Sequence, residues 1–140
     1  MISIAADPIR VVTLALVREG RLLTVRKRGT QHFMLPGGKP EAGEADSDGL
    51  IREIAEELSC ALESASLVLL GEFAASAANE PGRDVLARVH LGELSGDISL
   101  AAEIEALHWL DLDKTSPVLL APLLVTQVLP ALRRMTAPAS

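Results

Sequence analysis

Short apolar runs separated by turn residues fill most of the chain, and this pattern predicts strands. The runs cover residues 10–17, 22–28, 32–35, 66–75, 84–94 and 107–112. Several are rich in branched apolar side chains, and clusters of Gly, Pro, Asn, Asp or Ser lie between them, as expected of strands joined by turns. The first two runs flank a turn at residues 18–21, so we expect them to pair as a β-hairpin.

Residues 46–60 instead repeat apolar positions at helical spacing and predict an amphipathic helix. Its apolar arc, which would pack on a core, consists of Leu50, Ile51, Ile54, Ala55 and Leu58. The opposite face carries three carboxylates at positions i, i+3 and i+4, namely Glu53, Glu56 and Glu57. Asp46 or Ser47 can cap the first turn. Carboxylates this close repel one another, so this face is either a solvated acidic surface or a site for cations.

A second helix is expected at residues 121–135, and it is apolar nearly all round. Pro122 falls in its first turn, where proline is tolerated, and Pro130 is expected to kink or divide it. A surface helix normally shows a polar face. This helix is therefore either deeply buried or covers a partner, and we expect a homodimer through it or through the adjacent sheet edge.

Composition limits the class of protein. The 140 residues suffice for one domain with one core, which we place at residues 9–135, between a lead-in at 1–8 and a tail at 136–140. A net charge of −6 excludes a general basic surface for duplex nucleic acid. A single cysteine excludes a disulfide within the chain. We see no secretory signal and no membrane span, so we expect a cytoplasmic protein.

The segment before the acidic helix reads as a structured loop, because residues 35–44 contain three glycines and Pro40. An acidic helix face beside a glycine loop suits a hard divalent cation. Mg²⁺ in particular takes a few carboxylates together with substrate phosphates and keeps some waters. The loop and the helix together therefore predict a metal site.

The same residues resemble the Nudix box. Gly38 is followed after five residues by Glu44, and after seven more by the run Arg52-Glu53-Ile54-Ala55-Glu56-Glu57-Leu58-Ser59-Cys60. Every charged position of the family pattern is present, and Ser59 alone departs from it, standing where the family has a glycine that ends the helix. The resemblance implies an α/β (α+β) Nudix fold, a mixed β-sheet sandwiched between helices.

The resemblance also implies roles for residues. Metal ligands would be Glu53, Glu56 and Glu57 with the backbone carbonyl of Gly38 or Gly37, holding Mg²⁺ or alternatively Mn²⁺. Arg52 and Glu44 would pair, fixing the glycine loop to the helix and holding Glu53. The general base would be Glu53 or a glutamate on a distant loop, and we favour Glu103 over Glu105 and Glu80. The catalytic residues are thus expected to be Glu53, Arg52 and Glu103.

The implied reaction is metal-dependent hydrolysis of the diphosphate bond of a nucleoside diphosphate linked to another group. Candidate substrate-binding residues are Lys39, Arg26, Arg28 and Phe33. Marks that accompany ADP-ribose, dinucleoside polyphosphate, NADH and coenzyme A specificity are missing, which leaves (deoxy)nucleoside triphosphates in the manner of MutT-like enzymes. The alternatives are a nucleoside diphosphate sugar or ADP-ribose pyrophosphatase, and a non-catalytic module that senses nucleotides.

Overall fold

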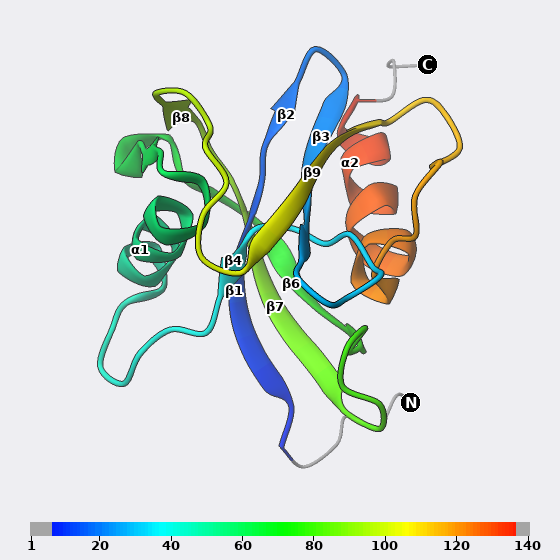
Figure 1. Ribbon diagram of the computed structural model, residues 1–140, viewed down its shortest axis with the longest axis horizontal. Helices are drawn as coiled ribbons and strands as arrows, with labels where there is room; N and C mark the ends of the chain where they lie inside the picture. The colour runs from blue at the N-terminus through cyan, green and yellow to red at the C-terminus, as the bar shows by residue number, and fades with distance from the viewer. Residues whose placement is uncertain (1–6, 137–140) are drawn as a thin grey trace.

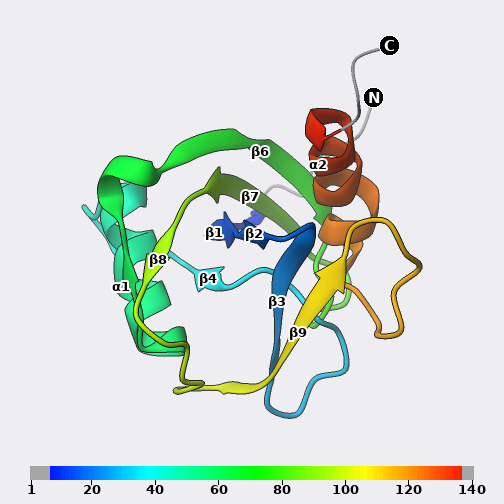
Figure 2. The same ribbon diagram turned by 90° about the horizontal axis from the view of Figure 1, so that it is seen from above.

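The protein is layered, with a helix on each side of β-structure (Figure 1). The computed structural model describes residues 7–136, so most of the expected lead-in and tail lies outside the described residues. Helix α1 (Asp46–Leu58) lies on one side of the strands, and α2 (Leu129–Thr136) lies on the other, as the view in Figure 2 also shows. This arrangement confirms the expected α+β fold with a mixed sheet between helices.

Three sheets supply the strands. The four-stranded sheet has the order β4 (Gly37–Gly38), β1 (Ile9–Ala15), β7 (Asp84–Leu91) and β6 (Val68–Ser76). The three-stranded sheet has the order β2 (Val17–Arg18), β3 (Arg21–Lys27) and β9 (Ile104–Asp111). Strands β5 (Ala61–Leu62) and β8 (Leu94–Ser95) form a separate pair, and a short 3₁₀ helix, η1 (Ser64–Ser66), precedes β6.

The prediction that residues 10–17 pair with residues 22–28 as a hairpin is wrong for most of their length. Strand β1 pairs in parallel with β7, from Ile9 opposite Val85 to Ala15 opposite Leu91. Only the two residues of β2 pair with the start of β3, while β3 takes β9 as its long partner. The reason is that β1 is apolar on both faces and lies in the interior of a sheet, as a strand covered on both sides should. The turn therefore carries the chain from one sheet to the other.

The two faces of β1 contribute to two separate parts of the core. One part lies under α1 and joins Leu50, Ile54 and Leu58 to Val12 and Leu14. The other lies under the last helix and includes Ala15, Ala87, Val89, Leu124, Val128 and Leu132. The apolar arc expected on α1 is thus the face that packs on the strands, although Ala55 itself is exposed.

Capping of α1 differs from the expectation. Ala45 is the N-cap and makes no side-chain cap hydrogen bond, whereas Asp46 is the first helical residue. The side chain of Asp46 is instead paired with Arg88 on β7, at 3.1 Å. The other end follows the expectation, because Ser59 adopts the left-handed conformation (φ 58°) in place of the usual glycine, and its N–H donates to the Ala55 carbonyl.

The last helix is mostly buried within its own domain. A π-helical turn, η2 (Leu124–Val128), precedes α2, and its wider turn falls directly before Pro130, which has no N–H to donate. Leu124, Val128, Leu129 and Leu132 are buried, while Val125 is exposed. The intramolecular core therefore accounts for most of the apolar surface that suggested a partner. No helix among residues 7–136 is both long and apolar enough to cross a membrane.

Candidate active site

The glycine loop is held against β1 by a close backbone approach. Gly37 has φ 145° and pairs with Thr13, and a Cβ at Gly37 would lie 2.1 Å from the Val12 carbonyl oxygen. The Gly37 N–H donates a 2.9 Å hydrogen bond to Glu57 Oε1. Since no side chain fits there, the loop can bring its amide directly to a carboxylate on α1.

Gly38 and Gly49 make room for carboxylates of the same cluster. A Cβ at Gly38 would lie 2.5 Å from the carboxyl carbon of Glu53, so only glycine lets Glu53 rest on this backbone. Gly49 is buried beneath the loop, where a Cβ would lie 3.0 Å from Glu44 Oε1 and 3.5 Å from the Pro40 Cα.

Arg52 ties the loop to the helix. Its Nε donates to Glu44 Oε2 at 3.0 Å and its Nη2 donates to Glu44 Oε1 at 2.9 Å, which is a two-pronged pair. A further bond runs from Nη1 to Glu53 Oε1 at 3.0 Å, and Nη2 donates to the Lys39 carbonyl at 3.3 Å. The Arg52 guanidinium and the Glu41 N–H lower the pKa of Glu44 to about 2, and the Glu44 carboxylate in turn raises the pKa of Arg52.

We expect the Glu44–Arg52 pair to stabilise the fold in a defined pH range. The pKa of Glu44 lies at about 2 in the folded protein against 4.5 ordinarily. The stabilisation is therefore complete above about pH 4.5 and is lost as the pH falls toward 2. Melting temperatures of the wild type and Glu44→Gln, measured from pH 7 to pH 2, should differ at neutral pH and converge in acid. A difference that stayed constant over this range would contradict the assignment.

Five carboxylates line one pocket beside this network. Glu53, Glu56 and Glu57 line it from α1, Glu80 lines it from the loop after β6, and Glu103 lines it from the loop before β9. Gly37, Gly38, Lys27 and Lys39 line it as well. Glu57 is only 6% exposed, and burial raises its pKa to about 7, opposed by the Gly37 hydrogen bond and by Lys27 and reinforced by Glu53 and Glu103. The pocket thus concentrates negative charge at a partly buried position.

The carboxylates of residues 7–136 do not converge into a ready group of three metal ligands. Glu57 is bonded to Gly37, whereas Glu53 and Glu56 both accept from Arg52, and 53% of the Glu56 side chain is exposed. This is compatible with Mg²⁺, which is usually bound by one or two carboxylates plus substrate phosphates rather than by a cage made of protein alone. The oxygen-rich donor set and the repulsion at Glu57 fit a hard divalent cation.

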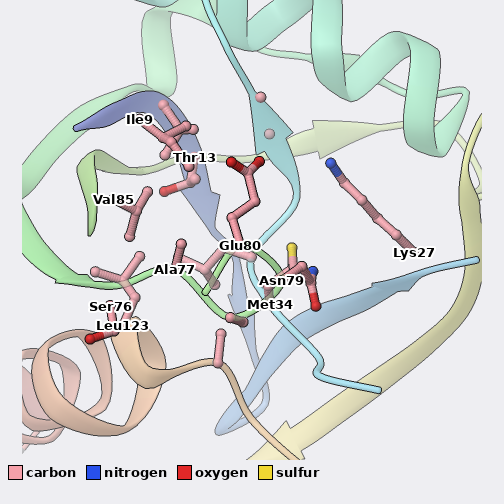
Figure 3. Close-up of a pocket in the computed structure, with 16 residues that line it drawn as sticks. Ile9, Thr13, Lys27, Met34, Ser76, Ala77, Asn79, Glu80, Val85 and Leu123 are labelled. Atoms are coloured by element: carbon pink, nitrogen blue, oxygen red, sulfur yellow. The ribbon is translucent and has the colours of Figure 1, made fainter. Parts of the chain in front are cut away.

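An apolar cavity adjoins the carboxylate pocket (Figure 3). Its walls come from β1, the segment before β4, the loop after β6, the start of β7 and the start of the last helix, and include Val11, Met34, Val85 and Leu123. The two spaces share Ile9, Val11, Lys27, Gly37, Gly38 and Glu80. The site is therefore one continuous depression with an acidic part and an apolar part.

The comparisons with known proteins agree with this geometry. A family model described as the NUDIX domain matches residues 7–131. The chain belongs to the Nudix family. A solved MutT Nudix hydrolase from Burkholderia pseudomallei is 31% identical, with 93% of this chain and 99% of that one covered and a TM-score of 0.73. The chain is accordingly a Nudix hydrolase, an enzyme of the pyrophosphohydrolase class.

Two more distant structures share the Nudix fold. A UDP-X diphosphatase is 23% identical over 94% of this chain and 64% of its own, with a TM-score of 0.74. An ADP-ribose pyrophosphatase from Streptococcus suis 89-1591 is 19% identical over 95% of this chain and 96% of its own, with a TM-score of 0.67. At these identities the similarity concerns the fold alone. A search of curated proteins found no match.

The structure brings only part of the predicted Nudix site together. Lys39 and Glu103 line the carboxylate pocket. Phe33, however, is buried and lies against His108 and Arg26. None of Arg26, Arg28 and Phe33 is among the residues that line the carboxylate pocket or the apolar cavity.

Arg26 is already engaged elsewhere. Its Nη1 donates to the Thr30 carbonyl and its Nη2 pairs with Glu105 at 3.1 Å, while Arg28 is exposed. Sequence reasoning passed over Lys27, the last residue of β3, which lies between them in the sequence and lines both parts of the site. The alternation of faces along the strand was a usable signal, but it required knowing which face looks toward the glycine loop.

Proposed function

We propose that this Nudix hydrolase is a (deoxy)nucleoside triphosphate pyrophosphohydrolase of the house-cleaning type, dependent on Mg²⁺ or Mn²⁺. The observation that carries the proposal is the junction of an acidic pocket with an apolar cavity. The phosphate chain would lie in the acidic part with the metal, and the nucleoside would extend into the apolar part. A substrate of this kind has a highly charged phosphate end and a largely uncharged nucleoside end, which correspond to the acidic and the apolar parts of the depression.

The metal ligands in this proposal are Glu53, Glu56 and Glu57, together with the backbone carbonyl of Gly38 or Gly37. A bound divalent ion would neutralise charge on the phosphates and lower the pKa of a bound water. Arg52 and Glu44 act indirectly, because their two-pronged pair holds the loop on the helix and Arg52 Nη1 fixes one oxygen of Glu53. Gly37 orients Glu57 in the same way through its N–H.

The general base in the proposal is Glu103, with Glu53 as the alternative. Glu103 lines the carboxylate pocket and is close enough to Glu57 to raise its pKa. Its side chain is exposed and belongs to a loop, so it can accept a proton from a water held between the phosphate and the loop. Glu53 is less free, because one of its oxygens accepts a hydrogen bond from Arg52.

In this proposal the phosphate contacts are Lys27 and Lys39. Arg26 and Arg28, which were expected from the sequence, are not used. Lys39 follows the glycines of the loop, and Lys27 lies where the acidic and apolar parts meet. Lys27 favours the charged form of Glu57, so its ammonium is near the carboxylate cluster. A phosphate at the boundary between the two parts would meet this ammonium as a point charge.

Replacing Lys27 with methionine should weaken substrate binding more than it slows turnover. The change keeps the length of the side chain and removes a charge that is worth about tenfold or more in affinity for a phosphate. Steady-state kinetics should show a raised KM for Lys27→Met, whereas Arg21→Met, which removes a charge from an exposed position at the start of the same strand, should behave as the wild type. A loss at Arg28→Met with none at Lys27→Met would favour the interpretation made from sequence.

Metal-dependent release of phosphate or pyrophosphate from nucleotides tests the proposed function, with Glu57→Gln as the blank. Activity on nucleoside diphosphate sugars or ADP-ribose alone would favour the first alternative. Tight nucleotide binding without turnover would favour a sensing module.

A cytoplasmic location and a homodimer stay predictions. For the dimer, edge strand β6 exposes Val68 and Leu69 and is the better candidate surface, because the last helix is largely buried.

A further inference from the structure

The apolar cavity contains a buried hydroxyl without a partner. Thr13 on β1 lines the cavity and is 6% exposed. Its Oγ1 is one of two buried side-chain polar atoms among residues 7–136 that lack a hydrogen-bond partner. Buried polar groups are nearly always satisfied, and one that is not calls for an explanation such as a ligand. Because Thr13 borders the cavity, a group bound there could supply the missing partner.

A carboxylate stands at the same cavity. Glu80 belongs to the loop between β6 and β7 and lines both the apolar cavity and the carboxylate pocket. Figure 3 shows it extending from this loop toward β1, between Thr13 and Lys27. Arg83 holds Glu80 from the loop side, with Nη1 3.5 Å from Oε2 and its backbone N–H on the Glu80 carbonyl. The cavity therefore presents the Thr13 hydroxyl and the Glu80 carboxylate, with Lys27, Ser76 and Asn79 as its other polar side chains, among otherwise apolar walls.

The cavity has room for the amino-bearing six-membered ring of a base, and it is open toward the carboxylate pocket. Its volume is about 160 Å³, close to the roughly 150 Å³ that holds a benzene molecule in an apolar protein cavity. Of the described residues that line it, none is aromatic. A base bound there is not stacked between rings, so its hydrogen-bonding edge must contribute more of the selectivity.

We propose that Thr13 and Glu80 are specificity-determining residues that select bases with an amino group next to a ring nitrogen, an inference that rests on the proposed function. Cytosine, adenine and guanine share this edge. The Glu80 carboxylate accepts from the amino group, and the Thr13 hydroxyl donates to an unprotonated ring nitrogen or accepts from a protonated one. Uracil and thymine offer a carbonyl oxygen instead of the amino group, and that oxygen is repelled by a carboxylate.

The experiment compares kcat/KM for CTP, ATP, GTP and UTP between the wild type and Glu80→Gln. The wild type should prefer the three amino-bearing nucleotides over UTP by about tenfold or more, because a polar group that is left opposed or unpaired is costly. Glu80→Gln should bring the ratio close to one, since an amide can also donate to the uracil oxygen. Glu93→Gln removes the same charge at an exposed position that lines neither part of the site and is the matched control.

Two results would overturn the inference. One is a wild type that treats all four bases alike. The other is a Glu80→Gln variant in which all four rates fall by the same factor, since that pattern belongs to a residue acting on the phosphates or on water rather than on the base.

Thr13→Val supplies an independent second variant. Valine has nearly the same shape as threonine and removes the unpaired hydroxyl, so the melting temperature of the free protein should stay the same or rise. Its kcat/KM on the amino-bearing nucleotides should nevertheless fall about fivefold to tenfold. Unchanged kinetics would remove Thr13 from the inference, and a lowered melting temperature would show that its hydroxyl has a structural partner.

The inference can fail separately from the proposed function. If no triphosphate is hydrolysed, the proposed function fails, and base selection is then measured by calorimetry with CMP, AMP, GMP and UMP. If UMP binds more weakly than CMP, AMP and GMP, the Thr13–Glu80 assignment is supported without any turnover. Equal affinities for the four nucleotides would overturn it. If all four triphosphates are hydrolysed at equal rates, the function stands and the inference is overturned.

Discussion

Glu57→Gln is expected to lose nearly all metal-dependent hydrolysis while keeping the fold. Losing even an outer-shell partner of a metal ligand typically costs about 10- to 100-fold in metal affinity or activity, so losing a ligand should cost at least about 100-fold. The amide oxygen of glutamine can still accept the Gly37 N–H bond that Glu57 Oε1 accepts at 2.9 Å. The change also removes a charge from a buried position crowded by Glu53 and Glu103.

The measurements for this variant are product release under saturating Mg²⁺ and thermal unfolding of the same sample. Turnover should fall by at least about 100-fold, with a melting temperature no lower than that of the wild type. Glu93→Gln is the control for the lost charge, because Glu93 is exposed and lines neither the carboxylate pocket nor the apolar cavity. Turnover in Glu57→Gln equal to that of the wild type would remove this residue from the metal site.

Gly37→Ala is expected to have the largest effect on stability. A Cβ at Gly37 would lie 2.1 Å from the Val12 carbonyl oxygen and 2.8 Å from the Thr13 Cα, both of them backbone atoms of a central strand. The φ of 145° is also one that alanine rarely adopts. Since neither backbone can yield without breaking the β1–β4 pairing, we expect the free energy of unfolding to fall by about 3 kcal/mol or more.

Gly43→Ala separates steric clash from backbone strain. Gly43 has φ 79°, but nothing lies within 4 Å of a Cβ built there. We therefore expect only the cost of a left-handed alanine, about 1 kcal/mol. Urea unfolding of both variants measures the difference between them. Equal losses at the two positions would contradict the account of Gly37 as a point of close backbone approach.

The spacing of apolar residues along the chain was sufficient to predict the acidic helix, although not its N-cap. The spacing of Leu50, Ile54 and Leu58 set the buried face, and Ser59 takes the positive φ expected at that position. The pairing of Arg52 with Glu44 also agrees with the expectation. These features depend on residues a few positions apart, whose relative placement a helix and a short loop determine.

Features that depend on distant pairing could not be obtained this way. The sequence of β1 does not reveal that its partner is β7, 76 residues further on, rather than the strand that follows it. The side of β3 that faces the site depends on the same long-range arrangement, which is why Lys27 was missed and Arg26 was favoured. The burial of Glu57 beneath the glycine loop likewise needs the contact between Gly37 and β1.

The measurement that tests the central claim most directly is product release over a panel of nucleotides with and without Mg²⁺ or Mn²⁺. The panel holds NTPs, dNTPs, oxidised dNTPs, nucleoside diphosphate sugars, ADP-ribose and dinucleotides, and Glu57→Gln is the blank. We predict a metal-dependent signal on the (deoxy)nucleoside triphosphates that is lost when the metal is chelated and is absent from the blank. Hydrolysis that persists in Glu57→Gln or without metal, or silence on every nucleotide in the panel, would contradict the account.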